Sequence, residues 1–276
     1  MTILVYDKYN NPRDLAQMDI YYALSEKYNL IYANPTNLIF LITEGNYDIL
    51  YLGILHPWHG NIDWEQALSI NKKPIIIDQA DNEGFLARKN SKYIYNDSNC
   101  ILLSRYLPNR LFDEWNGKLF LLPWYINPDR FIPQEKKIDV SFVCMINIKR
   151  LGADRKKMSQ EILNYCKDNG LSYVIGEYFG DNYRRIVTAS KAMVIDGSRF
   201  CLTQKYIEAS LSNCLIIGEH PTSPENQIKT VELSMINSKN INDFNENIQY
   251  NRTYILDTFA NKENFLKKFE DIISNF

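Results

Sequence analysis

Residues 197–221, GSRFCLTQKYIEASLSNCLIIGEHP, predict a loop, a short helix and then a strand. The helix carries Lys205 and Glu208, which are three residues apart and therefore share one face. The strand, residues 214–217, is apolar throughout and stops at Gly218. Such a strand is typical of a buried parallel sheet, where ligands bind beyond the carboxyl ends of the strands. We therefore expect the face with Lys205 and Glu208 to lie at such an edge.

The rest of the chain alternates short apolar strands with amphipathic helices. Predicted strands cover residues 3–6, 29–33, 47–55, 75–77, 100–103, 119–122, 140–146, 172–175 and 192–195. Predicted helices cover residues 15–28, 63–70, 156–169 and 183–189, with one or two more in 254–276. Alternation at this spacing indicates parallel sheets joined by right-handed crossovers. The sequence therefore predicts an α/β fold.

A proline-bearing stretch divides the chain into two alternating halves. Residues 123–133, PWYINPDRFIP, contain three prolines, each of which fixes φ and disfavours helix in the residue before it. This stretch predicts an extended linker. We expect a Rossmann-like domain of residues 1–130, a second one of residues 131–257, and a terminal helix of residues 258–276 that packs back toward the first domain.

Composition narrows the class of protein. The chain has 276 residues, of which 45% are hydrophobic and 23% charged, so it can bury substantial cores. Its net charge of -2 gives no support for a broad nucleic-acid surface. The five cysteines are scattered without a Cys-x-x-Cys pair, which is typical of a reducing compartment. No apolar run approaches the roughly 20 residues that span a bilayer, so we expect a cytoplasmic protein.

Two segments resemble GT-B glycosyltransferases. LPWYINPDRFIP, residues 122–133, is similar to the segment that joins the two domains of these enzymes. KYIEASLSNCLIIGEHP, residues 205–221, resembles the C-terminal domain of the glycosyl transferases group 1, in which a basic residue, an aromatic, Glu and Ala precede a small-residue turn and a strand. The resemblance implies two Rossmann-like domains with parallel sheets and a nucleotide-sugar donor held by the second domain.

The resemblance also implies roles for individual residues. Glu208 would bind the ribose hydroxyls, and Lys205 would lie near the diphosphate. Residues 197–203 would offer backbone N–H groups to phosphate oxygens, with Thr203 as the N-cap of the helix. The implied donor-binding residues are Asn147, Lys149, Arg150, Ser198, Arg199, Thr203, Lys205, Tyr206 and Glu208. A solvated surface pair is the alternative for Lys205 and Glu208.

The sequence departs from the family pattern at two places that bear on the reaction. Many retaining members carry a second glutamate eight positions before the one that matches Glu208, and Phe200 stands there instead. No glycine-rich loop follows the first strand. A retaining reaction is favoured by the group resemblance, while the stereochemical outcome stays open.

Polar residues near two strand ends are candidates for the acceptor side. His56 follows one predicted strand, and Asp78 and Asp81 follow another. An aspartate there could act as general base toward an acceptor hydroxyl in an inverting reaction. The alternative for both aspartates is to cap a following turn or helix. His56 and His59 are a weak metal signal without further ligands at zinc spacing, so we expect neither a metal nor another cofactor.

The sequence therefore predicts a metal-independent glycosyltransferase that moves a sugar from a nucleotide-sugar donor to a hydroxyl acceptor. One alternative is an enzyme of this architecture that glycosylates hydroxylated DNA bases, which the net charge of -2 makes less favoured. The other is a non-catalytic nucleotide- or glycan-binding protein of the same fold.

Overall fold

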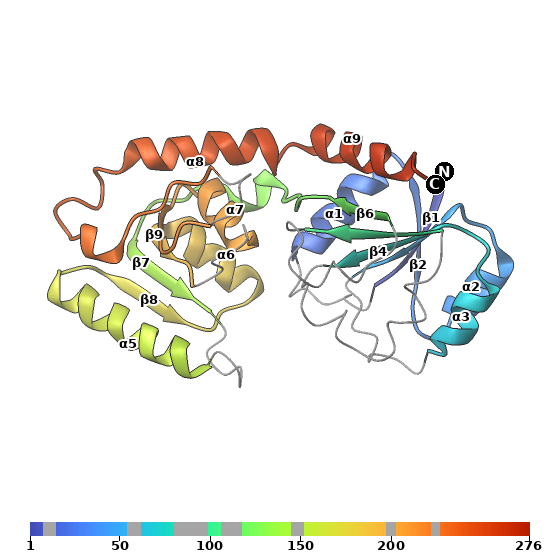
Figure 1. The fold of residues 1–276 in the computed structure, drawn as a ribbon. Helices are drawn as coiled ribbons and strands as arrows, with labels where there is room; N and C mark the ends of the chain where they lie inside the picture. The colour runs from blue at the N-terminus through green and yellow to red at the C-terminus, as the bar shows by residue number, and fades with distance from the viewer. Residues whose placement is uncertain are drawn as a thin grey trace. The chain divides into compact units, whose positions relative to one another are not determined.

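The computed structural model describes residues 1–7, 15–53, 62–79, 99–105, 118–144, 152–196, 203–221 and 227–276. The chain divides into two compact units, each with its own parallel sheet (Figure 1). Unit 1 comprises Met1–Trp124 and Lys262–Phe276, and unit 2 comprises Tyr125–Asn261. The predicted α/β class with two Rossmann-like sheets is confirmed.

Unit 1 contains a sheet of six strands in the order β2-β1-β3-β4-β5-β6. The strands are β1 Thr2–Tyr6, β2 Asn29–Ala33, β3 Ile49–Leu52, β4 Ile75–Gln79, β5 Cys100–Ser104 and β6 Lys118–Leu121. The chain runs outward from β1 to β2 and then returns to β3 on the other side of β1. This reversal is a topological switch point, and sheets of this order bind ligands in the crevice beyond the carboxyl ends of the strands there.

Helices pack on the unit 1 sheet because its strands are apolar on both faces. The helices are α1 Leu15–Ser25, α2 Leu38–Glu44, α3 Trp64–Ile70 and α9 Lys262–Ile273. One face of the sheet packs with Leu38 and Ile42 of α2 and Ala67 of α3. The C-terminal helix α9 brings Phe269 to 5.8 Å from Tyr28 and 6.3 Å from Tyr51, measured between ring centroids. Residues from both ends of the chain therefore share the core of unit 1.

Unit 2 contains a sheet of four strands in the order β10-β9-β7-β8. The strands are β7 Ile138–Val143, β8 Tyr173–Gly176, β9 Ser190–Val194 and β10 Leu215–Ile217. Its helices are α5 Gly152–Asp168, α6 Gly180–Ala189, α7 Gln204–Leu211 and α8 Asn245–Thr258, with short 3₁₀ helices η3 Pro128–Phe131 and η4 Leu233–Met235. Alternate residues of β7, Val140 and Phe142, enter the same core as Leu215 and Ile217 of β10.

Two glycines of unit 2 adopt backbone conformations that other residues rarely adopt, one after α5 and one after β10. Gly170, at φ +65°, follows the end of α5 as predicted, and Leu171 N–H closes the turn on Cys166 O at 2.9 Å. Gly218, at φ +141°, follows β10, and a Cβ there would lie 2.6 Å from Ile195 O. Only glycine fits this conformation and this close approach, so β10 and the end of β9 lie tightly together.

Two short elements were not predicted. Helix α2 was not predicted, because its sequence LIFLITE is rich in β-branched and aromatic residues, which favour helices weakly. Burial of Leu38 and Ile42 decides the conformation there.

The predicted extended linker is interrupted by the 3₁₀ helix η3. At its start the Asn127 side chain accepts a hydrogen bond from Asp129 N–H at 3.1 Å. In the described part of the chain, no helix is both long and apolar enough to cross a bilayer.

Candidate functional site

Three charged side chains meet at the carboxyl edge of the unit 2 sheet. Asp196 lies just beyond β9, Arg155 in the first turns of α5, and Lys205 in the first turn of α7. Arg155 Nε donates to Asp196 Oδ2 at 2.5 Å, and Lys205 Nζ donates to Asp196 Oδ1 at 3.2 Å. We call these three residues the Asp196 cluster. One carboxylate therefore holds two cations at a strand edge.

The Asp196 cluster is partly shielded and contains two cations for one carboxylate. Its side chains are 18% exposed for Arg155, 13% for Asp196 and 27% for Lys205. Burial alone would raise the pKa of Asp196, but the Lys205 ammonium and the Arg155 guanidinium outweigh it and hold that pKa below its usual value. The formal charges of these three side chains sum to +1. An anion such as a phosphate is the ligand that this arrangement suits.

Glu208 lies in α7 and is 7% exposed. Its Oε2 accepts a hydrogen bond from the hydroxyl of Tyr183 on α6. Burial raises the pKa of Tyr183 well above its usual value, and the Glu208 charge raises it further, so the phenol remains a donor. Glu208 is buried and Lys205 pairs with Asp196, so the two do not form a solvated surface pair.

Thr203 and Tyr206 lie at the start of α7. Thr203 is the residue at the predicted N-cap position, but its side chain makes no cap hydrogen bond. Its Oγ1 is enclosed and has no hydrogen-bond partner among the described residues. Tyr206 is fully buried and donates its hydroxyl to Glu219 O at 3.1 Å. This contact favours a packing role for Tyr206 over the predicted contact with the nucleotide-sugar donor.

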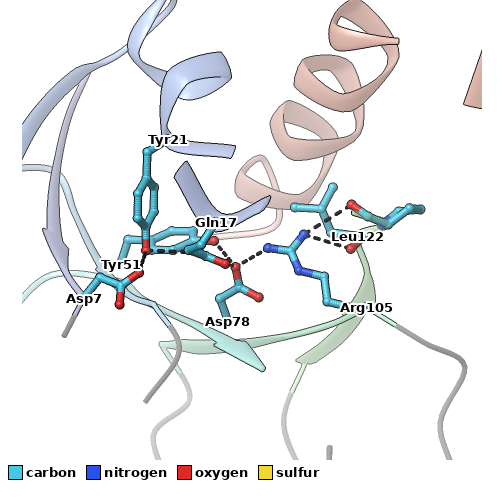
Figure 2. A network of polar contacts seen from close by, with 8 residues as sticks. Asp7, Gln17, Tyr21, Tyr51, Asp78, Arg105 and Leu122 are labelled. Carbon is cyan, nitrogen blue, oxygen red and sulfur yellow. Dashed lines mark hydrogen bonds and ion pairs between the residues drawn. The ribbon is translucent and has the colours of Figure 1, made fainter. Parts of the chain in front are cut away.

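A second polar group lies in unit 1, centred on Asp78 (Figure 2). Asp78 belongs to β4, so the strand extends past the predicted end at Ile77. Its carboxylate pairs with the Arg105 guanidinium, and both side chains are 0% exposed. Burial opposes the charge of Arg105, but Asp78 outweighs this and raises the guanidinium pKa. Arg105 Nη1 also donates to Leu122 O at 3.0 Å, which ties β5 to the end of β6.

Further donors surround the same carboxylate. Asp78 Oδ2 accepts from the Tyr51 hydroxyl and from Gln17 Nε2, the latter at 3.2 Å. Gln17 Nε2 also donates to the Tyr21 hydroxyl at 3.0 Å, and Tyr21 donates to Asp7. We call these residues the Asp78 network: Asp7, Gln17, Tyr21, Tyr51, Asp78 and Arg105. Asp78 is enclosed among protein donors inside a strand, which fits a positioning role better than the predicted role of general base or its alternative, a cap of a turn or helix.

Several predicted site residues lie outside the described residues. They are His56, Asp81, Asn147, Lys149, Arg150, Ser198 and Arg199. Their roles stay predictions.

Sequence reasoning missed Arg155, Asp196, Arg105 and Tyr183. Asp196 could have been found, since it follows a predicted strand at the edge where ligands bind. Arg155 gave no such signal, because helix α5 was predicted to begin after it. Among the described residues, no three His, Cys, Asp or Glu side chains converge on a position for a metal ion.

Comparison with known proteins places the fold. No family model matches this sequence, and no curated protein matches it either. The structure is similar to Anabaena Alr3699/HepE in complex with UDP and glucose, with a TM-score of 0.60 and 11% identity over 100% of both chains. It is similar to the sucrose-phosphate synthase of Thermosynechococcus elongatus, with a TM-score of 0.62 and 10% identity over 100% of both chains. The pneumococcal O-GlcNAc transferase GtfA with UDP and GlcNAc gives a TM-score of 0.52 and 12% identity over 89% of this chain and 60% of that one.

These structures are GT-B glycosyltransferases, and this chain has their fold. The identities of 10–12% carry the fold alone. Without a family match, the resemblance of residues 205–221 to the group 1 domain stays a prediction.

Proposed function

We propose that this chain is a glycosyltransferase that moves a sugar from a nucleotide-sugar donor to a hydroxyl group of an acceptor. The observation that carries the proposal is the Asp196 cluster, in which two cations share one carboxylate at the carboxyl edge of the second sheet of a GT-B fold. Solved neighbours of this fold contain UDP or UDP-glucose. Unit 2 would bind the donor and unit 1 the acceptor.

The donor diphosphate is the ligand that we assign to the Asp196 cluster. Arg155 and Lys205 would pair with phosphate oxygens, and their fixed charges would stabilise the charge that develops on the leaving nucleoside diphosphate. The first N–H groups of α7 would add donors to the same anion. Glu208 would accept hydrogen bonds from the ribose hydroxyls, with Tyr183 holding one of its oxygens in place.

The predicted donor-binding residues that lie outside the described residues are also part of this proposal. Asn147, Lys149 and Arg150 precede α5, and Ser198 and Arg199 precede α7, so both segments border the elements that carry the cluster. We propose that they contact the diphosphate and sugar of the donor.

The proposed reaction is metal-independent, because two side-chain cations can supply the charge stabilisation that a divalent ion would otherwise provide. The group resemblance favours retention at the anomeric carbon, and proton NMR of the first-formed product reads the outcome directly. A cytoplasmic location is part of the proposal. It is supported by Cys100, Cys144, Cys166 and Cys214, which are buried thiols.

The test is titration of the protein with UDP-, GDP-, ADP- and CMP-sugars, followed by thermal shift and by release of the nucleoside diphosphate. Glycosyltransferase activity predicts a shift with one base and slow donor hydrolysis or transfer. The absence of both responses across the panel rejects the proposal. Donor binding without turnover on any supplied saccharide would favour the non-catalytic alternative, for which Phe200 in place of the second glutamate is the motivation. A DNA acceptor has no observation in its favour among the described residues beyond the shared fold.

A further inference from the structure

Asp7 and Gly53 lie together at the switch point of the unit 1 sheet. Asp7 directly follows β1 and Gly53 directly follows β3, the two strands between which the strand order reverses. Gly53 N–H donates to Tyr6 O at 2.8 Å, which holds the two strand ends side by side. Ligands of such sheets bind in the crevice beyond these strand ends. Asp7 is partly exposed there, in contrast to the enclosed Asp78.

Gly53 makes room for a positioned carboxylate. A Cβ at this residue would lie 2.7 Å from Asp7 Oδ2 and would also collide with the Tyr21 hydroxyl. Contacts of this length do not occur around real Cβ atoms, so any larger residue would displace Asp7, Tyr21 or both. The bare backbone at Gly53 is therefore part of the site.

Hydrogen bonds within the Asp78 network connect Asp7 to the enclosed Asp78. The Tyr21 hydroxyl donates to Asp7 Oδ2, and Gln17 Nε2 donates to the Tyr21 oxygen at 3.0 Å, as Figure 2 shows. Burial and the Asp7 charge raise the pKa of Tyr21 well above its usual value, so Tyr21 stays a donor. Gln17 is in turn held on Asp78, which Arg105 neutralises. A continuous set of hydrogen bonds thus fixes a partly exposed carboxylate on an enclosed ion pair.

We propose that Asp7 binds the attacking hydroxyl of the acceptor, an inference that rests on the proposed transferase function. A carboxylate accepts hydrogen bonds from hydroxyl groups, so the acceptor class that fits is a polyhydroxylated molecule such as a saccharide. Asp7 would orient the nucleophile, and Tyr21 would act as a positioning residue that fixes the carboxylate. Orientation of this kind is sensitive to displacements of about 1 Å, which can lower rates by about 100-fold.

Hydrolysis of the nucleotide-sugar tests the role of Asp7 before the acceptor is identified, because water then replaces the acceptor hydroxyl group as the nucleophile. We expect Asp7→Ala to lower the hydrolysis rate of the responding nucleotide-sugar by about 10- to 100-fold while its affinity for the nucleoside diphosphate is unchanged. Tyr21→Phe removes the hydroxyl that donates to Asp7 and accepts from Gln17, and it should lower the rate by about 2- to 10-fold with little change in KM for the donor. Gly53→Ala should resemble Asp7→Ala, since it displaces the same carboxylate.

Asp48→Ala is the matched control. Asp48 precedes β3 at the opposite, amino edge of the same sheet, where its Oδ2 accepts from Thr2 N–H at 2.7 Å. Its turnover should equal that of the wild type. The inference is overturned if Asp7→Ala hydrolyses the donor at the wild-type rate, or if it loses nucleotide affinity or folded structure in parallel with rate. A wild type that binds nucleotide but transfers sugar neither to water nor to saccharides, or that binds no nucleotide at all, would instead reject the proposed function itself, and the inference with it.

Discussion

The Asp78 network of unit 1 and the Asp196 cluster of unit 2 occupy equivalent edges of two parallel sheets but differ in their charged groups. The Asp78 network contains two carboxylates, Asp7 and Asp78, and one guanidinium, which pairs with Asp78. The Asp196 cluster contains two cations that share one carboxylate. A negative site suits ligands that donate hydrogen bonds, such as hydroxyl groups, and a positive site suits anions. The two sheets thus provide different chemistry from one architecture.

The two groups also differ in burial. Arg105 and Asp78 are both 0% exposed, whereas the side chains of the Asp196 cluster are 13–27% exposed. A fully enclosed ion pair has no way to exchange one partner for a ligand, so its role is to hold its neighbours in place. A partly exposed cluster can exchange the carboxylate for an incoming phosphate. The difference separates the enclosed Asp78–Arg105 pair, which supports Asp7 within its network, from the Asp196 cluster, whose charged groups can themselves bind a ligand, and it makes distinct predictions for mutations in each.

The largest expected effect is on stability, from Arg105→Met. This change leaves Asp78 enclosed without its cation, which costs about 3–5 kcal/mol in the free energy of unfolding. All four tryptophans, Trp58, Trp64, Trp115 and Trp124, belong to unit 1, so urea unfolding followed by tryptophan fluorescence reports on this unit. Lys27→Met is the control within unit 1. Lys27 pairs with Glu270 on the surface, with side chains 46% and 39% exposed, and should cost at most about 1 kcal/mol.

A double variant shows whether the unpaired charge is the cause. Asp78→Asn added to Arg105→Met removes the buried carboxylate charge, so the double variant should be more stable than Arg105→Met alone. A double variant less stable than the single one would mean that the guanidinium matters through packing against Trp124, whose ring centroid lies 5.0 Å from Arg105 Cζ.

The next largest effect is on nucleotide affinity, from Lys205→Met and Arg155→Met. Each removes one charged donor to the proposed diphosphate, worth about 1.5–3 kcal/mol, so affinity should fall by about 10- to 150-fold. Isothermal titration with the nucleoside diphosphate that binds, and with the matching nucleoside, makes the measurement specific. The affinity for the nucleoside should hardly change, because it carries no phosphate.

Lys157→Met provides the matched control for this loss. Lys157 lies on the same helix as Arg155, and its side chain is 80% exposed beside Glu161. Its removal should leave both affinities unchanged. Equal losses for the diphosphate and the nucleoside in Lys205→Met or Arg155→Met would contradict the assignment of the Asp196 cluster to phosphate.

The sequence predicted the fold well because its main signal is local. Buried parallel strands such as residues 49–52 and 100–104 appear as short apolar runs between polar turns, and their order along the chain indicates the crossovers. The exceptions, α2 and η3, are short elements whose conformation depends on burial or on a side-chain hydrogen bond. Such elements carry no periodic pattern long enough to detect.

The site was predictable only where a motif carried it. Lys205 and Glu208 were found from the segment around α7, but their surroundings were not. Arg155 and Asp196 are 41 residues apart, Asp78 and Arg105 are 27 apart, and Tyr183 and Glu208 are 25 apart. Only the sheet order brings these partners together. From the sequence alone, a charged residue is predicted to be solvated. Whether it is instead buried and paired depends on a partner that is distant in the sequence.

The smallest expected effect is on the pH dependence of the stability of unit 2, through Asp196. The pKa of Asp196 is lower in the folded chain than its usual value of about 3.9, so the unfolded chain binds this proton more readily as the pH falls. The resulting stabilisation is present above pH ~4 and is lost as the pH falls through the folded pKa. Because the cluster is partly exposed, we expect this stabilisation to be at most about 1 kcal/mol.

In Asp196→Asn this contribution is absent. Urea unfolding followed by circular dichroism should therefore show a difference from the wild type in the free energy of unfolding that is largest near pH 6 and shrinks below pH ~4. The tryptophan signal of unit 1 in the same samples is the internal control, since none of the tryptophans lies in unit 2. A difference that stays constant with pH would mean that Asp196 stabilises unit 2 through hydrogen bonds that an amide can also make, and the contrast between a charged exchangeable site and a fixed scaffold would then lose its electrostatic basis.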